Sequence, residues 1–523
     1  MSWEPEADEI AKRRQWALEM GGKERVKVHH ERGFLTIRER LDLLCDKNSF
    51  QEIGGLAGKA TYNEKGEVQH VTPMPYVMGL AKINGRPAAV GGEDTTIPGG
   101  TSMSGKNWRI KGGQGGFVDD LACEYKIPLV RFISGYGGSV GSTKSTGYAV
   151  MPGHSRVPFQ NSAELLATVP VVSAITGIAA GGPAGRAMMS HFTVMTKGSV
   201  IFAAGPPVVE RGTGEKLTKE ELGGWRIAVN KAGTVDNVAE DEEDCVRQMK
   251  TFLSFMPQNV WEMPPVVKTG DPVDRCEEEL LEIIPRDQRK PYNMRQLIEL
   301  IVDKGSMFEI QPTHGRSCIN VLARLDGLPI GIIANNPMLG GVVDVKSANK
   351  QTRFIELCDC FHIPLLFLVD VPGYGIGLEA ESAGALRAGM RQLYVKHQAT
   401  VPKLALVVRR CYGMAGGTTL DKVGLNYKIA WPSGHWGSLP VEGGTLAAFR
   451  REIESAPDPD KRREEIEAEL KSLSSPFRTA EAFAIEDIID PRETRPYLCQ
   501  VFEAMQGKLK LGLGPKQKGG VRP

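Results

Sequence analysis

Two stretches of this chain, RERLDLLCDKNSFQEI at 38–53 and RQLIELIVDKGSMFEI at 295–310, follow one pattern. Each begins with an arginine, carries an Asp-Lys pair in its second half and ends in Glu-Ile. Similarity between distant parts of one chain is the sequence signature of a repeated structural unit. The two stretches therefore predict that the chain contains the same fold twice.

Three further pairs of segments follow in the same order in both halves, and the offset between them drifts only from 257 to 232 residues. The pairs are 80–90 with 322–332, 122–134 with 358–370, and 169–182 with 401–414. Chance is a poor explanation for four collinear matches. The region 260–290 is rich in proline and charge, which favours a boundary there. We predict an N-terminal domain at 1–265 and a C-terminal domain at 266–523.

Each half alternates short apolar runs with helical stretches. Runs such as PLVRFI (128–133) and VIFAAG (200–205) are bounded by Gly or Pro, as is typical of strands that are buried on both faces. Helical patterns at 114–126 and 351–362 lie between such runs. Strand–helix alternation predicts an α/β fold with a mostly parallel sheet. We also expect a charged helical excursion at 455–475.

The composition excludes several classes of protein. A net charge of +1 over 523 residues gives no bulk attraction to nucleic acid or to an anionic membrane. No apolar run approaches the roughly 18 residues that span a bilayer. The polar, acidic N-terminus lacks the features of a signal or transit peptide, so we expect a cytoplasmic, bacterial protein. The nine cysteines include no CxxC pair, which predicts free buried thiols and no metal site.

Two loops that occupy equivalent places in the repeats are the best candidates for chemistry. The loop 177–185 (GIAAGGPAG) and the loop 409–417 (RRCYGMAGG) each follow a predicted strand. A strand that ends in small residues before a helix presents backbone N–H groups, which favour an anionic oxygen. The expected donors are Gly181, Gly182, Met414 and Ala415. A tight glycine turn without function is the alternative for each loop.

Side-chain catalysts are harder to find. His435 is a lone histidine that we interpret as structural, and Glu379 and Glu381 fit the solvated start of a helix. Two oxyanion sites without an evident base suit a reaction whose base arrives with a cofactor.

The segment GTSMSGK at 100–106 fits a phosphate loop, but Asn107 stands where magnesium binding requires Ser or Thr. Lys106, Arg109 and Lys111 form either a coenzyme A phosphate site or a solvated basic loop.

Several longer segments resemble the carboxyltransferase (β) subunit of biotin-dependent acyl-CoA carboxylases, of the propionyl-CoA carboxylase β type. The resemblance extends from about residue 25 to about residue 510. The segments that carry it are 35–53, 200–224, 302–310, ANNPM at 334–338, LVDVPGYGIGLEAESAGALRAGMRQLYVKHQATVPK at 368–403, and WPSG at 431–434.

The resemblance implies a crotonase-like (ClpP/crotonase) ββα-superhelix domain in each half. It implies that the first half binds acyl-CoA, with the thioester enolate at Gly181 and Gly182. It also implies that the second half binds carboxybiotin, with the ureido oxygen at Met414 and Ala415. The substrate-side residues would include Gly137, Gly138 and Gly417 besides the basic loop, and the biotin-side residues would include Gly373, Tyr374 and Gly413.

The same resemblance implies partners. This chain lacks an Ala-Met-Lys-Met attachment motif, so biotin would be carried by a separate protein and loaded by a separate biotin carboxylase. Family members assemble as hexamers whose active sites lie between subunits. We expect no nucleic acid, membrane or metal ion to take part.

Three segments depart from the family pattern. The segment 134–147 replaces an Asp-Ser-Gly-Gly-Ala-Arg run, the loop 412–417 replaces Tyr-Gly-Gly-Ala-Tyr-Asp, and SGHWGSLPVEGG follows WP at 433–444. Gly417 stands where an aspartate helps to choose the acyl chain. These changes leave the acyl substrate open. They also leave two alternatives, a biotin-dependent acyl-CoA decarboxylase subunit and a catalytically degenerate scaffold. A crotonase-like hydratase is disfavoured, because the loop around Gly181 has no paired glutamates.

Overall fold

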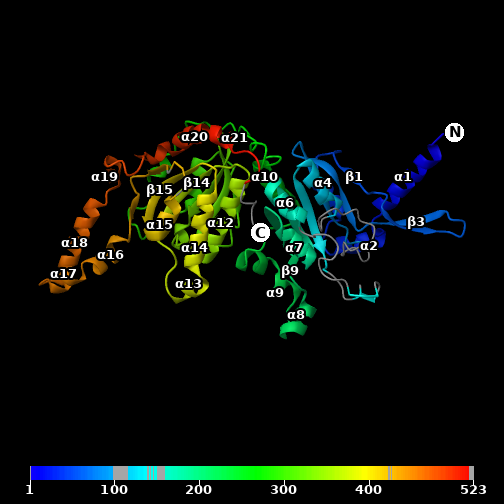
Figure 1. Ribbon diagram of the computed structural model, residues 1–523, viewed down its shortest axis with the longest axis horizontal. Coiled ribbons are helices and arrows are strands. Elements are labelled where there is room, and N and C mark those ends of the chain that lie inside the picture. The colour runs from blue at the N-terminus through cyan, green and yellow to red at the C-terminus, as the bar shows by residue number, and fades with distance from the viewer. Residues whose placement is uncertain are drawn as a thin grey trace. The chain divides into compact units, whose positions relative to one another are not determined.

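The computed structural model describes residues 2–97, 116–137, 141, 143–144, 147–149, 160–421, 424–425 and 427–516. The chain forms two compact units (Figure 1). The first unit runs to Glu262 and the second from Met263 to Leu513. The chain after Leu513 returns to the first unit, where the Gly514 N–H donates to the Val260 carbonyl oxygen at 2.7 Å.

The first unit is built on one mixed sheet with the strand order β1-β4-β5-β6-β7-β8-β10, and β9 pairs with β7. The strands from β5 onward are parallel, while β1, β4 and β5 are antiparallel. A separate hairpin consists of β2 and β3. The strands are β1 (Gln51–Ile53), β2 (Gly58–Tyr62), β3 (Val68–Pro73), β4 (Tyr76–Ile83), β5 (Arg86–Glu93), β6 (Leu129–Gly135), β7 (Val171–Ala180), β8 (Phe192–Thr196), β9 (Val200–Phe202) and β10 (Asn237–Ala239). The helices are α1 (Glu4–Leu18), α2 (Lys23–Glu31), α3 (Ile37–Leu44), α4 (Phe117–Tyr125), α6 (Gln160–Thr168), α7 (Gly182–Met188), α8 (Pro206–Thr213), α9 (Lys219–Gly223), the π-helix η1 (Arg226–Lys231) and α10 (Glu242–Phe255).

The second unit repeats this sheet strand for strand, in the order β11-β12-β13-β14-β15-β16-β18, with β17 on β15. The strands are β11 (Phe308–Ile310), β12 (Cys318–Leu325), β13 (Leu328–Asn335), β14 (Leu365–Val371), β15 (Lys403–Tyr412), β16 (Tyr427–Ala430), β17 (His435–Gly437) and β18 (Asp487–Ile488). The α-helices are α11 (Met294–Ile301), α12 (Val345–Cys360), α13 (Leu378–Ala383), α14 (Ala385–Gln398), α15 (Gly413–Leu420), α16 (Val441–Ala448), α17 (Arg450–Ser455), α18 (Pro459–Leu473), α19 (Pro476–Glu481), α20 (Thr494–Ala504) and α21 (Gln506–Leu511). The 3₁₀ turns are η2 (Glu278–Leu281), η3 (Pro337–Leu339) and η4 (Pro491–Glu493). The identical strand order confirms the predicted duplication.

The central strands are apolar because helices cover them. Every residue of β6 and of β14 is buried. In the second unit the core gathers Ile298, Leu366, Leu404 and Trp431 from a helix, two strands and the segment after β16. Because both faces of these strands are buried, the sequence shows continuous apolar runs rather than an alternation of apolar and polar residues.

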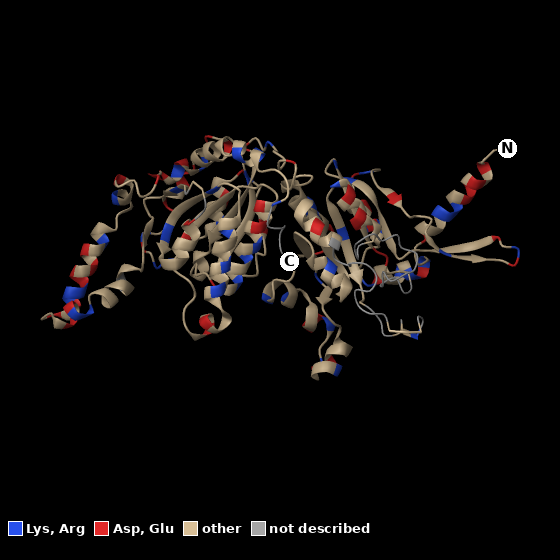
Figure 2. Ribbon diagram, in the orientation of Figure 1, with Lys and Arg blue, Asp and Glu red and all other residues tan. Residues whose placement is uncertain are grey.

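Two of the predicted helices exist with different starts. The helix expected from 351 begins earlier, at Val345, because the Asp344 side chain accepts the Ser347 N–H at 2.7 Å and caps it. The helix expected from 114 is described only from Phe117. The charged excursion at 455–475 is α18, along which basic and acidic side chains are mixed (Figure 2).

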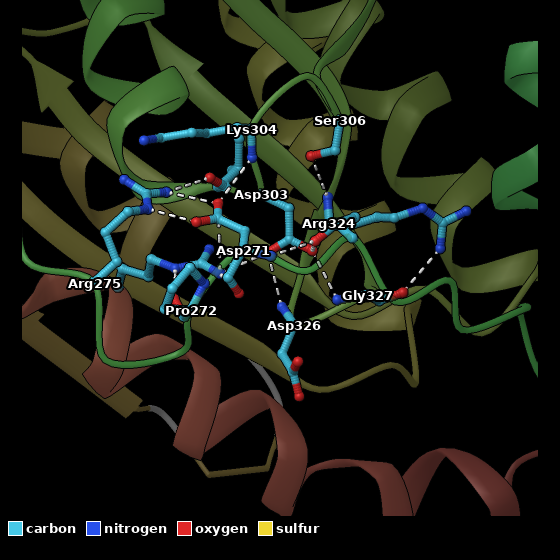
Figure 3. Close-up of polar contacts among 12 residues, drawn as sticks. Asp271, Pro272, Arg275, Asp303, Lys304, Ser306, Arg324, Asp326 and Gly327 are labelled. Atoms are coloured by element: carbon cyan, nitrogen blue, oxygen red, sulfur yellow. Dashed lines mark hydrogen bonds and ion pairs between the residues drawn. The ribbon is translucent and has the colours of Figure 1, made fainter.

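The aspartate of the repeated Asp-Lys pair has a structural role. The Asp303 carboxylate accepts the N–H groups of Asp326 and Gly327, at 3.0 and 2.7 Å, in the turn between β12 and β13 (Figure 3). Asp46 accepts the Asn84 and Gly85 N–H groups in the same way. These turns lie where β13 and β5 begin, so they stand at the opposite edge of the sheet from the carboxyl ends of the parallel strands.

Candidate oxyanion sites

The loop of the second unit is a sharp junction between β15 and α15. Gly413 has a positive φ of +58°, and a Cβ atom there would lie 3.1 Å from the Ser438 carbonyl oxygen. α15 begins at Gly413, and its N-cap residue Tyr412 provides no side-chain cap. The first N–H groups of a helix have no partner inside the helix. The amides of Met414 and Ala415 are therefore positioned as donors at the end of a buried strand.

The loop of the first unit has the same construction. Gly181 follows β7 with a φ of +61°, and α7 begins at Gly182 without a side-chain cap. A Cβ atom on Gly181 would lie 3.3 Å from the Cα of Gly137, so the two glycines allow a close approach of backbones. Pro183 has no N–H, which leaves the Gly182 amide as the first available donor of the helix.

The Gly181 amide itself is already engaged, since its N–H donates to the Phe202 carbonyl oxygen at 3.3 Å. The sequence could not show this bond, because it depends on the pairing of β9 with the last residues of β7. Gly181 therefore turns the chain rather than donating freely.

Equivalent strands hold the two junctions. β9 pairs in parallel with β7 at Ile178–Ala180, and β17 pairs in parallel with β15 at Arg410–Tyr412. Each central strand thus has a third partner next to the loop, which fixes the point where the chain leaves the sheet. The two loops are structural equivalents, as the repeat predicts.

A buried ion pair lies next to the first loop. Arg186 of α7 pairs with Glu93 at the end of β5, and both side chains are almost fully buried. Burial opposes the charged guanidinium, but the Glu93 carboxylate outweighs this and raises the pKa of Arg186. Glu93 also accepts the Ser134 N–H at 3.1 Å. Its carboxylate is thus held in place and is unsuited to act as a base.

The second loop has a different buried charge cluster. The Asp370 carboxylate at the end of β14 pairs with Arg409 at 2.8 Å and with Arg410 at 2.6 Å. Burial alone would raise the pKa of Asp370, but hydrogen bonds and charges from Arg410 and Arg409 hold it below the ordinary value. Arg410 also donates to the Gly340 carbonyl oxygen at 3.2 Å. The cluster joins three segments around the root of the loop.

Two of the expected biotin-side residues, Tyr374 and Gly373, are held by hydrogen bonds with other segments of the second unit. The Tyr374 hydroxyl donates to Oγ1 of Thr418, on α15, at 2.8 Å. The Gly373 carbonyl oxygen accepts the Val343 N–H at 3.1 Å. Gly413 is the first residue of α15, whereas Thr418, the partner of Tyr374, lies in the last turn of that helix.

His435 is half-buried against Tyr412, with ring centroids 5.8 Å apart. Burial lowers its pKa below the ordinary value, and Nδ1 lies 3.1 Å from the Ser433 carbonyl oxygen. The geometry fits the expected structural role. Glu379 and Glu381 are exposed in the first turn of α13, which confirms that they start a solvated helix.

Some predicted positions lie outside the described residues, namely Lys106, Arg109, Lys111 and Gly138. Gly417 lies on α15, and a Cβ atom there would meet nothing within 4 Å.

Within the described part of the chain, no group of three His, Cys, Asp or Glu side chains could hold a metal ion. Eight of the nine cysteines are buried, and burial raises the pKa of Cys411 to about 12. Across the described ranges no helix is long and apolar enough to cross a membrane.

The model of the carboxyl transferase domain matches residues 28–519. This chain belongs to the carboxyl transferase family. It is 32% identical to the carboxyltransferase subunit of propionyl-CoA carboxylase from Haloferax mediterranei, over 98% of each chain. It is also 32% identical to the methylmalonyl-CoA carboxyltransferase 12S subunit of Propionibacterium freudenreichii subsp. shermanii, over 96% of this chain and 94% of that one.

The solved structure of transcarboxylase 12S, a hexamer with methylmalonyl-coenzyme A and methylmalonic acid bound, aligns with a TM-score of 0.85. It shares 31% identity over 97% of this chain and 96% of that one. These likenesses confirm the family and the crotonase-like fold that the sequence predicts. The protein is an acyl-CoA carboxyltransferase.

Sequence reasoning missed the buried ion pairs beside the loops. A signal was present, because Arg131 interrupts the apolar run PLVRFI and Asp370 ends the run LLFLVD. A charge inside a strand that is buried on both faces requires a buried partner. The partners, Asp119 for Arg131 and Arg409 for Asp370, could not be deduced without the topology.

Proposed function

We propose that this chain moves a carboxyl group from carboxybiotin to the α-carbon, or to a vinylogous carbon, of an acyl-CoA. The observation that carries the proposal is the pair of equivalent junctions at Gly181 and Gly413, each with a positive φ and an uncapped helix start. One junction would stabilise the oxygen of a thioester enolate, and the other the ureido oxygen of biotin. Backbone amides fixed at such positions are efficient because they need no reorganisation during the reaction.

In the first unit the donor role falls to Gly182. Its N–H is the first of α7 and no side chain caps it, whereas the Gly181 N–H is engaged with Phe202. Gly181 and Gly137 serve by leaving room, since neither carries a Cβ at their close approach. A thioester oxygen that becomes anionic would be held at the positive end of this helix.

In the second unit the amides of Met414 and Ala415 fit a ureido carbonyl oxygen, which is a hydrogen-bond acceptor. Biotin, when bound, supplies the transferred carboxyl group and a basic nitrogen. Tyr374 fixes α15 through Thr418, and the Asp370 cluster fixes the strand that precedes the loop. The buried carboxylates of Glu93 and Asp370, whose partners belong to the loop segments, are held in ion pairs, which is consistent with a base that comes from outside the protein.

The partners in this proposal are a biotin carrier and a biotin carboxylase on other chains, and the chain itself assembles as a hexamer. The proposal is supported by the hexameric assembly described for transcarboxylase 12S and by the absence of an attachment motif in this sequence. The proposal does not specify the identity of the acyl chain, because Gly417 has no side chain that could select it.

A decarboxylase is the second candidate. This chain is 32% identical to the α subunit of methylmalonyl-CoA decarboxylase from Veillonella parvula, over 96% of each chain, which is no less than its identity to the carboxylase subunits. A screen of acyl-CoA thioesters with ATP, bicarbonate and the co-purified biotin subunits tests carboxylation. Release of carbon dioxide from a malonyl-type CoA in the presence of biotin, without any ATP-driven carboxylation, would favour the decarboxylase.

The sharpest test of the site is Gly182→Pro, which deletes one N–H at a helix position that tolerates proline. Removing one oxyanion donor typically lowers turnover about 10²- to 10³-fold. Gly182→Ala keeps the N–H and serves as the matched control for the loss of glycine. Turnover near the wild-type level in an assembled Gly182→Pro complex would exclude this amide as a donor.

A further inference from the structure

The second unit contains a cavity of about 560 Å³ on the side of β15 that faces the segment 280–288. Its wall also includes the residues that follow β16 and the turn between α18 and α19. A volume of this size is within the usual range of roughly 300–1,000 Å³ for small-molecule sites. Segment 280–288 precedes the first repeated stretch of the second half, at 295–310, so the cavity is built partly from chain outside the matched repeats.

The charges around this cavity are of one sign. Arg286, Arg409 and Lys471 line it, whereas no Asp or Glu does. Arg409 is neutralised by Asp370. The Arg286 side chain is exposed and has no ion-pair partner among the described residues. A guanidinium without a partner at the mouth of a cavity is suited to bind a carboxylate through two parallel hydrogen bonds.

Part of the lining is apolar. Leu281, Ile284 and Pro432 are apolar lining residues that keep exposed surface, whereas Leu280 and Trp431 of the lining are buried core residues. The Trp431 indole N–H is already used, since it donates to Oγ1 of Thr494 at 2.9 Å. Because Trp431 is also fully buried, it supports the lining without offering a polar group to a ligand. A ligand that fits Arg286 and the exposed apolar lining has an anionic head and an apolar body.

We propose that this cavity binds a small amphipathic monocarboxylate, with its carboxylate on Arg286 and its aliphatic chain against Ile284 and Pro432. The lining does not include the proposed donors Met414 and Ala415, but it does include Tyr412 of the second loop, which directly precedes Gly413. A bound carboxylate would therefore contact the residue at the root of the second loop. The site gives such a ligand a route to change carboxyl transfer without occupying the thioester site.

The test is a calorimetric titration of the full chain with octanoate, read in parallel by tryptophan fluorescence. We expect saturable binding that Arg286→Gln weakens by roughly tenfold or more, since a charge-assisted hydrogen bond is lost. Arg289→Gln is the matched control, because Arg289 is an exposed arginine nearby that pairs with Asp287 and does not line the cavity. Octylammonium should bind far more weakly than octanoate.

A second variant tests the location. Ser475 lines the cavity, and although it is the N-cap of α19 its side chain makes no capping bond, so Ser475→Trp fills space without removing a cap. This variant should keep the wild-type melting temperature and lose octanoate binding. Unchanged binding in Arg286→Gln or in folded Ser475→Trp would overturn the proposal, as would equal binding of octylammonium. Failure of the wild-type chain to bind millimolar octanoate would also overturn it, whatever the outcome for carboxyl transfer.

Discussion

Replacing Gly413 by alanine separates the role of the second loop in catalysis from its role in folding. The residue has a φ of +58°, and the left-handed region costs an L-amino acid about 1–2 kcal/mol. The new Cβ would also lie 3.1 Å from the Ser438 carbonyl oxygen, so the loop must shift by a few tenths of an ångström. For a domain of about 250 residues, each kcal/mol lowers the melting temperature by about 2–4 °C. We expect a loss of about 2–8 °C.

Turnover should fall much further than stability, because the shift displaces the amides of Met414 and Ala415. The loss of one well-placed donor costs about 10²–10³ in turnover. The control is Gly305→Ala, at a positive φ of +73° with nothing within 4 Å of the added Cβ, in the turn at 303–306 that precedes β11. Steady-state carboxyl transfer and calorimetric melting would be measured on both variants. Equal turnover in the two variants, at similar melting temperatures, would refute the role of the second loop.

Three other predictions have defined outcomes. Asp370→Asn should lower the free energy of unfolding by about 3–5 kcal/mol, because it leaves Arg409 buried without a counter-charge. Denaturant unfolding measures this free energy, and a loss below about 1 kcal/mol would contradict the prediction. Because burial lowers the pKa of His435, stability should fall as the pH drops below about 6.5, where the unfolded histidine gains a proton first. His435→Gln should flatten that pH dependence, and an unchanged slope would assign the effect to other groups. Light scattering should give the mass of a hexamer, and a stable monomer at micromolar concentration would count against shared assembly.

Much of the fold could be predicted because the repeat is visible in the amino-acid sequence. The matched stretches at 38–53 and 295–310 contain aspartates, Asp46 and Asp303, that bind equivalent turns, so the same local physics preserves the same residues in both halves. Helix boundaries were less predictable. α12 starts earlier than expected because Asp344 caps it, which a periodicity count does not detect.

The candidate site could be predicted only as far as its backbone. Glycine clusters after apolar runs identified both loops, because positive φ angles and close approaches demand glycine. What could not be predicted was which amides are engaged. The Gly181 N–H is lost to Phe202 through the pairing of β9 with β7, a contact between segments that are more than 20 residues apart. The buried partners of Asp370 were unpredictable for the same reason.

The two units share one hydrogen bond from a backbone N–H to a side chain, but they differ in the charged residues around it. The Glu93 side chain accepts the Ser134 N–H, and at the equivalent point the Asn335 side chain accepts the Asp370 N–H. The buried carboxylate is thus on β5 in one unit and on β14 in the other, while the glycine junction is the same in both. Donors that belong to the backbone survive side-chain replacement, and the altered residues at 412–417 keep the positive φ of Gly413 and the uncapped helix start that the proposed oxyanion role requires. We therefore expect the departures from the family pattern to change the ligand rather than to produce a degenerate scaffold.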